Sequence, residues 1–297
     1  MMRFLAKVAI QRLIGAVPGG AAHYERTRRR RILADLEEVT VQKLAVAGRY
    51  LEILRAAGGT EAEAEALTDH LEIGGGWLPV IPLILRRHGL TRQTIIDVAR
   101  LMRPEDAAAA AAILDRLDPA AAPLAPAADE PPAGWLERLG IAYRAPLSPP
   151  LPFPDAGFDL ITATQVLQYP APDRLRAIHR DAARLLRPGG LYLLSIELTD
   201  LYHHFDPALP RFHFLRYSET TWRRWFDNPY TPLNRLRAVQ HRALLEEAPF
   251  DILFWETTGG GADDLAELRR APPHAEFSHL PDRELARDGL IALARRR

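Results

Sequence analysis

Apolar residues recur along the chain in two patterns, short β-branched or aliphatic runs and longer segments with helical spacing. The short runs predict strands at residues 71–73, 94–97, 141–145, 191–196, 250–256 and 289–294, with a further strand at the end of 151–163. The helical spacing predicts helices at 1–20, 32–56, 107–117 and 236–247. Strands that alternate with helices indicate an α/β fold around a largely parallel sheet.

The segment before the first strand is helical in pattern. Residues 1–20 form a basic amphipathic helix that ends at 18–20, and the helix over 32–56 ends at Gly58-Gly59. We therefore expect a helical N-terminal extension over residues 1–60 and a core domain over residues 61–297. The run of arginines at 28–31 is typical of a solvated helix face.

Two later segments depart from the alternating pattern. Residues 104–135 are rich in alanine and proline and are predicted to be an insertion, in which 119–132 forms an exposed loop that lacks the apolar content to pack. The connection between the last two strands is polar and rich in Gly and Pro. We expect that connection to be a loop outside the core.

Composition narrows the class of protein. Among 297 residues, Lys plus Arg equals Asp plus Glu at 38 each, so the net charge does not favour a nucleic-acid partner. The chain contains no cysteine, which excludes disulfides, thiolate catalysis and cysteine-ligated metals. No apolar run has the length of a membrane span or the form of a cleavable signal, and a cytoplasmic location is expected.

The strongest local motif follows the first predicted strand, where residues 70–79 read HLEIGGGWLP. Glycines let the backbone turn sharply and approach a ligand closely, and Pro79 and Pro82 suit the first turn of a helix. A dinucleotide fingerprint would require a third glycine where Pro79 stands. The remaining pattern is an acid, Glu72, two residues before Gly74 and four before Gly76.

Three further segments follow in a characteristic order. Residues 94–97 read TIID and place Asp97 where a nucleotide-binding sheet uses an acid to accept hydrogen bonds from ribose hydroxyls. Residues 151–160 read LPFPDAGFDL, and residues 184–191 read RLLRPGGL. Together with the acid-x-Gly-x-Gly turn, these motifs resemble those of the class I S-adenosylmethionine (SAM) methyltransferases. The resemblance covers about residues 69–256, and within it residues 197–206 look like a bacterial group of uncharacterised members.

The resemblance implies a Rossmann-like sheet of seven mostly parallel strands with an antiparallel last strand. It also implies SAM as the cofactor, with Glu72 contacting the methionine end of SAM through its amine. Asp97 would bind the ribose hydroxyls. The full set of expected cofactor-binding residues is Glu72, Gly74, Gly75, Gly76, Trp77, Asp97, Val98 and Thr164.

An aromatic segment follows the fifth predicted strand. Residues 200–234 leave the carboxyl end of that strand, where ligands bind in open α/β sheets, and they predict a helical substrate lid. The alternative is that the rings pack a small helical subdomain against the sheet. For residues 1–20, we expect packing on the sheet or a cap on the cofactor cleft, with contact to an anionic membrane surface as the alternative.

Methyl transfer depends mainly on holding the acceptor in line with the methyl group. An oxygen or nitrogen acceptor also has a proton to lose, and histidine is the side chain suited to that step near neutral pH. His203 and His204 are the candidate bases, with Asp206 close enough in sequence to orient one ring. Surface histidines or a metal site are the alternatives, but the spacing matches no metal motif, so no metal is expected.

The sequence therefore predicts a SAM-dependent methyltransferase that modifies an oxygen or nitrogen of a small molecule. A nucleotide-dependent oxidoreductase or epimerase on a similar sheet is one alternative, and Pro79 counts against it. A non-catalytic SAM-binding or scaffold protein is another, because a fold does not by itself establish chemistry. The sequence specifies neither the acceptor nor the oligomeric state.

Overall fold

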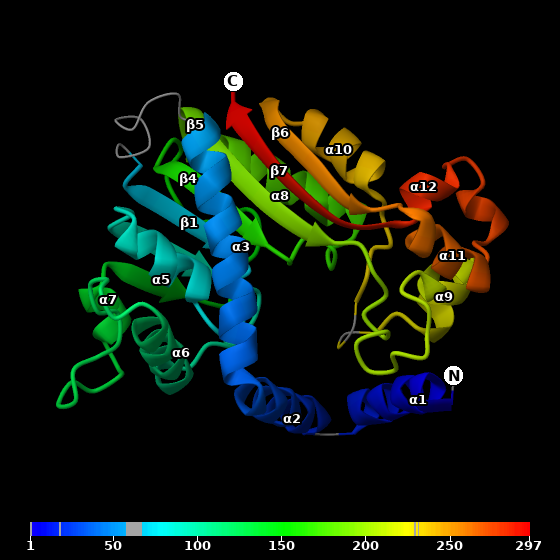
Figure 1. Cartoon of the computed structure of the whole chain (residues 1–297), viewed down its shortest axis with the longest axis horizontal. Coiled ribbons are helices and arrows are strands. Elements are labelled where there is room, and N and C mark those ends of the chain that lie inside the picture. The colour runs from blue at the N-terminus through cyan, green and yellow to red at the C-terminus, as the bar shows by residue number, and fades with distance from the viewer. Residues whose placement is uncertain (1, 18, 58–66, 229, 231) are drawn as a thin grey trace.

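The computed structural model describes residues 2–17, 19–57, 67–228, 230 and 232–297. Its centre is a seven-stranded sheet in the order β3-β2-β1-β4-β5-β7-β6 (Figure 1). Strands β1 to β5 pair in parallel, and β7 lies antiparallel between β5 and β6. The predicted sheet and its antiparallel last strand are confirmed. The strands are β1 (Asp69–Ile73), β2 (Arg92–Ile96), β3 (Ile141–Arg144), β4 (Phe158–Thr164), β5 (Leu186–Glu197), β6 (Phe250–Gly259) and β7 (Arg287–Arg296).

Helices cover both faces of this sheet (Figure 1). Neighbouring residues of a strand point to opposite faces, so Leu160 and Ile161 of β4 belong to two different clusters of buried residues. The cluster with Leu160 includes residues of α3 (Leu36–Ala57), α5 (Val80–Arg87), α6 (Pro104–Leu117) and α7 (Trp135–Arg138). The cluster with Ile161 includes residues of α8 (Pro172–Leu185) and α10 (Ala238–Glu246). Both faces are therefore buried, as a parallel sheet requires.

The helical N-terminal region is divided differently from the prediction. The helix expected over 32–56 is wrong at its start, because α2 (Gly20–Ala34) ends at Ala34, and α3 begins at Leu36 after the single residue Asp35. The predicted stop at Gly58-Gly59 lies outside the described residues. Arg29 of α2 donates two hydrogen bonds to Asp106 of α6, at 2.6 and 2.5 Å, and so fixes α2 against the core. Ahead of it, α1 (Met2–Ala16) lies apart from the sheet (Figure 1).

Three distant segments build a second hydrophobic core, which we call the helical subdomain. It contains α1, the described residues from Leu201 to Leu233 with η1 (His213–Arg216) and α9 (Glu219–Trp225), and the segment 262–286 with α11 (Ala262–Arg270), η2 (Ala275–Phe277) and α12 (Asp282–Leu285). Phe4 of α1 packs edge-on to Tyr202 with ring centroids 4.8 Å apart. Most aromatic rings of 200–234 are buried here, including Tyr202, Phe212, Phe214 and Trp222.

Two segments expected to be loops outside the core are better packed than predicted. The connection before β7 is not excluded from the core, because Leu268, Phe277 and Leu285 are buried in the helical subdomain. Within 119–132, Leu124 is buried and its backbone carbonyl accepts a hydrogen bond of 2.8 Å from Trp135. In both cases a few apolar side chains meet a distant partner that the local pattern does not reveal.

The other boundaries agree with the sequence to within a few residues, except that β5 begins at Leu186 instead of 191. Its first residues pair with β4 before the register shifts between Phe158 and Leu160. Gly189 in this stretch has a φ of +78°, a left-handed conformation that favours glycine. Among the described residues, no helix has the length and apolar character to cross a membrane.

Candidate cofactor and acceptor site

The glycine turn between β1 and α5 brings the backbone close to two neighbouring side chains. Gly74 has a φ of +79°, and a Cβ built on it would lie 2.4 Å from Val166 Cγ2. A Cβ on Gly75 would lie 2.2 Å from Ile95 Cγ2. Gly76 also has a positive φ of +64°. A side chain at either of the first two positions would displace the turn, so the glycines create the cradle that a nucleotide-like ligand needs.

Asp97 at the end of β2 ties this turn to the neighbouring strand. Its Oδ2 accepts a hydrogen bond of 2.9 Å from the Gly76 N–H, and its Oδ1 accepts one of 3.2 Å from the Ala99 N–H. A carboxylate has four lone-pair positions, so capacity remains for ligand hydroxyls. Val98 follows directly and is 74% exposed, an apolar side chain left open beside the acid.

Glu72 is buried at the end of a hydrogen-bonded chain of side chains. Gln93 donates to two backbone carbonyls, so its Oε1 accepts from His70 Nδ1 at 2.7 Å. His70 Nε2 lies 2.7 Å from the Thr162 hydroxyl, which also bonds to Glu72. Burial lowers the pKa of His70 to about 4, so this ring is neutral near pH 7.

The Thr162 hydroxyl has one proton and two neighbours that can accept it. If Glu72 is ionised, Thr162 donates to it and His70 Nε2 receives no proton. If Glu72 is protonated, it donates to Thr162, and Thr162 donates to His70. Burial raises the pKa of Glu72 to about 7, against the hydrogen bond from Thr162 and the charge of Lys43, which both lower it. The protonated form satisfies every bond in the chain.

Lys43 of α3 is a cation that sequence analysis missed. Its Nζ donates a hydrogen bond of 3.2 Å to the Leu78 carbonyl at the end of the glycine turn. Burial lowers its pKa, while the charges of Glu72 and Asp97 raise it, so the ammonium lies within electrostatic reach of both acids. The one feature of the sequence that could have indicated this role is that Lys43 is a charged residue among the regularly spaced apolar residues of the helix.

The remaining predicted cofactor residues lie around the same turn. The indole Nε1 of Trp77 is buried and has no hydrogen-bond partner among the described residues. Thr164 ends β4, and its hydroxyl helps lower the pKa of Glu72. The site therefore offers two donors, the free indole N–H and the Lys43 ammonium, together with a glycine turn and two acids. These groups fit a ligand with ribose, amine and carboxylate functions.

Comparison with known proteins finds a family match for part of the chain. Residues 92–194 match the family model for a methyltransferase domain. This part of the chain, from β2 into β5, is therefore similar to a methyltransferase domain. The cofactor of such a domain is SAM, as the sequence predicts. The search of curated proteins finds no match.

Solved structures with a similar arrangement have low sequence identity to the chain. Geranyl diphosphate methyltransferase in complex with SAM has 11% identity and a TM-score of 0.48, over 89% of this chain and 91% of that one. A SAM-dependent methyltransferase from Methanosarcina mazei has 16% identity and a TM-score of 0.43, over 77% and 92%. One from Mesorhizobium loti has 19% identity and a TM-score of 0.42, over 82% and 96%.

The predicted catalytic histidines have different surroundings. His204 is half-exposed, and its Nε2 lies 2.6 Å from Oε1 of Glu197 at the carboxyl end of β5. His203 Nδ1 instead donates to the Leu209 carbonyl at 2.6 Å, a bond that holds the local turn. Asp206 is buried, and the carboxylate that pairs with His204 is Glu197, which sequence analysis did not select.

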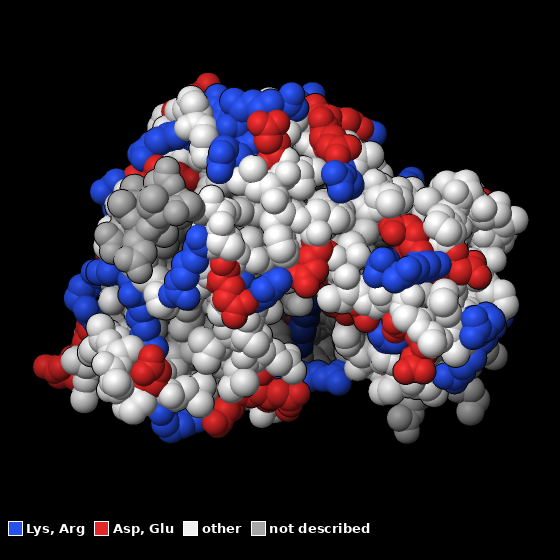
Figure 2. All heavy atoms as spheres, turned by 45° about the horizontal axis from the view of Figure 1, so that its top comes forward, with Lys and Arg blue, Asp and Glu red and all other residues white. Residues whose placement is uncertain are grey.

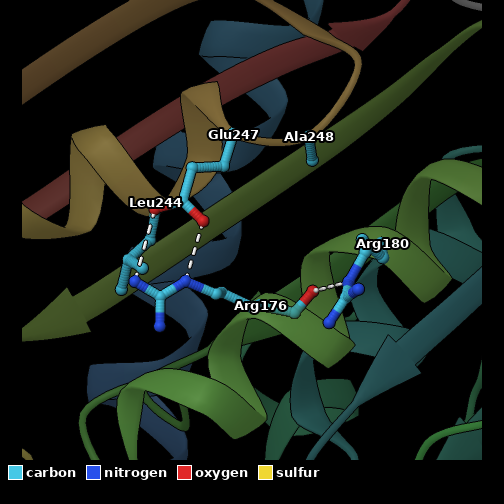
Figure 3. Close-up of a pocket in the computed structure, with 5 residues that line it drawn as sticks. All are labelled: Arg176, Arg180, Leu244, Glu247 and Ala248. Atoms are coloured by element: carbon cyan, nitrogen blue, oxygen red, sulfur yellow. Dashed lines mark hydrogen bonds and ion pairs between the residues drawn. The ribbon is translucent and has the colours of Figure 1, made fainter.

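One pocket away from this edge is lined in part by charges that are already paired. The pocket between α8 and α10 contains Arg176, whose guanidinium is already paired with Glu247 at 2.8 Å (Figure 3). The described part of the chain contains no group of three or more His, Asp or Glu residues that could hold a metal ion. The carboxyl edge of β1, β2, β4 and β5 therefore remains the best candidate site.

Proposed function

We propose that the chain is a SAM-dependent methyltransferase that acts on an oxygen or nitrogen atom of a small molecule. The observation that carries the proposal is the glycine turn after β1, with Glu72 buried before it and Asp97 bonded to it, at the edge of a methyltransferase domain. When bound, SAM supplies the sulfonium methyl group that the acceptor takes up.

Different residues at and around the turn would bind different parts of SAM. Glu72 in its ionised form would bind the amine of the methionine end, and the Lys43 ammonium, which lies within electrostatic reach of Glu72, would bind its carboxylate. Asp97 would accept hydrogen bonds from the ribose, and Val98 would offer an apolar surface to the adenine ring. Trp77 Nε1 supplies a further donor.

The acceptor would bind beside the ends of β4 and β5. Thr164 pairs with Ser195 in the sheet, so Glu197 lies two residues beyond the end of β4. Glu197 orients His204, which would take the proton from the acceptor as the methyl group is transferred. Segment 200–234 would close over the acceptor as a lid, with its buried rings forming the lid's own core.

Calorimetric titration tests the cofactor. SAM or S-adenosylhomocysteine should bind, and Glu72→Ala or Asp97→Ala should each weaken binding by about 1–3 kcal/mol through loss of charge-assisted hydrogen bonds. Glu246→Ala on the surface of α10 is the matched control and should bind normally. Unchanged affinity in both site variants would overturn the assignment.

The same titration separates the alternatives. Binding of NAD(P) in place of SAM would favour an oxidoreductase or epimerase. Binding of SAM that never produces S-adenosylhomocysteine with any acceptor would favour a scaffold protein.

A further inference from the structure

Helices α1 and α2 present three cations to one place beside the proposed acceptor site. Lys7 of α1 lies over the ring of Phe205, and Cζ of Arg31 of α2 lies 4.9 Å from the centroid of the same ring. Arg28 is one turn before Arg31, on the same face of α2, and its charge also acts on Lys7. Phe205 follows His204 directly, so the cluster adjoins the proposed base.

The cluster also reaches the ends of the central strands. The hydroxyl of Tyr169, which follows β4, lies within electrostatic and hydrogen-bonding reach of Arg28 and within electrostatic reach of Glu197. Lys7 in turn lies within electrostatic reach of His204. Figure 2 shows a hollow in the middle of the molecular face, with Lys and Arg atoms deep inside it and at its rim.

None of these three cations has a carboxylate partner in an ion pair within the described parts of the chain, although Arg29 between them is paired with Asp106. The Lys7 ammonium is buried and lacks any hydrogen-bond partner there. The carboxylate of Asp200 lies within electrostatic reach of Lys7. Its Oδ1 accepts a hydrogen bond from the Tyr202 N–H at 2.9 Å, and its Oδ2 lies 3.4 Å from His213 Nδ1 without a hydrogen bond among the described residues.

A buried ammonium flanked by two guanidinium groups is unfavourable unless an anion joins it. Burial lowers the pKa of Lys7 to about 7, and the charges of Arg31 and Arg28 add to this effect while the charge of Asp200 opposes it. Guanidinium groups bind phosphate and carboxylate oxygens in a two-pronged geometry, and an ammonium adds a point charge.

We propose that Lys7, Arg28 and Arg31 bind an oxyanion of the methyl acceptor, so that the substrate is a small molecule that carries a phosphate or carboxylate group. This inference rests on the proposed function and specifies its substrate class. The anion would anchor the acceptor on α1 and α2, while its reactive atom extends past Phe205 to His204. The helical N-terminal region thereby becomes part of the substrate site.

Thermal unfolding in the presence of soluble anions tests the site. The anions are compared at constant ionic strength, with chloride as the balancing salt. We expect the Tm of the full chain to rise either with the phosphates (inorganic phosphate and pyrophosphate) or with the carboxylates (acetate and citrate). The class that gives the larger rise identifies the type of oxyanion. Arg28→Gln, Arg31→Gln and Lys7→Met should each require roughly tenfold more anion for the same shift, because each removes a charge-assisted hydrogen bond. Arg30→Gln, an exposed position on α2 with the same charge change, should respond like the wild type.

The stability of the variants without anion shows whether they fold normally. Without added anion, Arg28→Gln and Arg31→Gln should be at least as stable as the wild type, because each relieves repulsion between like charges. If Arg30→Gln loses the anion response to the same extent, the effect is general electrostatics and the proposal is wrong. Stabilisation by anionic phospholipid vesicles alone, and not by soluble anions, would overturn it in favour of a lipid surface.

A parallel SAM titration separates this proposal from the proposed function. If the three variants bind SAM like the wild type but lose the anion response, both proposals are supported. If the wild type binds SAM but no soluble anion raises its Tm, the acceptor proposal is overturned and the cofactor assignment stands. If the wild type binds anions but not SAM, the assignment of the anion to a methyl acceptor is overturned.

Discussion

His204 Nε2 and Glu197 Oε1 lie 2.6 Å apart and join the end of the fifth strand to the segment that follows it. The Glu197 bond raises the pKa of His204, while burial and the charge of Lys7 lower it. Burial would raise the pKa of Glu197, but hydrogen bonds from His204 and Thr199 outweigh it and lower that pKa. The pair therefore holds one ring in place and strengthens it as a base.

Replacement of His204 by Gln should lower the rate of methyl transfer by roughly 10²-fold with SAM affinity unchanged, because a general base typically contributes that much. The loss should shrink at high pH, where the acceptor loses its proton unaided. Glu197→Gln should shift the rising limb of the pH–rate profile to lower pH, since the group that raises the pKa of His204 is gone. His203→Gln is the control and should retain its pH profile; normal turnover in the His204 variant would show that transfer proceeds by positioning alone.

Glu72→Gln should stabilise the protein above neutral pH while it weakens SAM binding. The pKa of Glu72 is raised from 4.5 to about 7, so its favourable contribution is complete below pH 4.5 and is lost as the pH rises through 7. The Gln variant should therefore gain up to about 3 kcal/mol of unfolding free energy at pH 8 and nothing at pH 4. Urea unfolding across this pH range measures the difference, and a constant gap would contradict the burial argument. Glu246→Gln on the surface is the control.

Gly74→Ala should destabilise the fold by about 1–3 kcal/mol and reduce SAM affinity, because a side chain there combines a left-handed backbone with a close approach to Val166. Gly48→Ala in α3 is the matched control. A Cβ at Gly48 meets nothing within 4 Å, so the helix should gain about 0.5–1 kcal/mol. Thermal unfolding and calorimetry on both variants check the contrast. Equal stability of the two would show that the turn tolerates a side chain.

Phe4→Ala should destabilise the helical subdomain by about 3–5 kcal/mol, because Phe4 is 2% exposed and contacts Tyr202, His213 and Phe226. Limited proteolysis should then become faster within residues 200–234, with SAM affinity retained. Leu5→Ala, at an exposed position on the same helix, should behave like the wild type. Unchanged proteolysis in Phe4→Ala would mean that α1 contributes little to this core.

If residues 200–234 form a lid, SAM together with an anionic acceptor should slow proteolysis of that segment. Cleavage in the exposed part of the 119–132 loop, which lies outside the proposed site, should be unaffected and provides the control. Equal cleavage of 200–234 with and without ligands would contradict a lid.

Sequence analysis predicted the features that depend on neighbouring residues and missed those that depend on contacts between distant segments. Glu72 lies near the end of one strand, and the glycine turn and Asp97 each directly follow a strand, so periodicity and spacing were enough to predict their places at one sheet edge. Glu197 and His204 are seven residues apart, yet their pairing depends on how the chain turns after β5. Lys43 reaches the site from a helix that precedes the sheet.

Local patterns in the sequence could not predict the helical subdomain. Phe4, Phe214 and Leu268 come from three segments that are distant in the sequence, and at least one strand of the central sheet lies between each segment and the next. The connection before β7 was predicted as a loop because its few apolar residues are spaced irregularly among polar ones. Only the tertiary structure reveals that these residues share one core.

The three-part core also places a constraint on how this protein is made. Phe4 and Val8 leave the ribosome long before residues 268–286, the last of their packing partners, have been translated. Domains generally form as units during synthesis, so the apolar face of α1 has to wait, exposed, while the sheet grows. Strand β7 enters between β5 and β6 at the same late stage. The acceptor side of the molecule should therefore be its last part to mature and the one most dependent on chaperone protection in the cell.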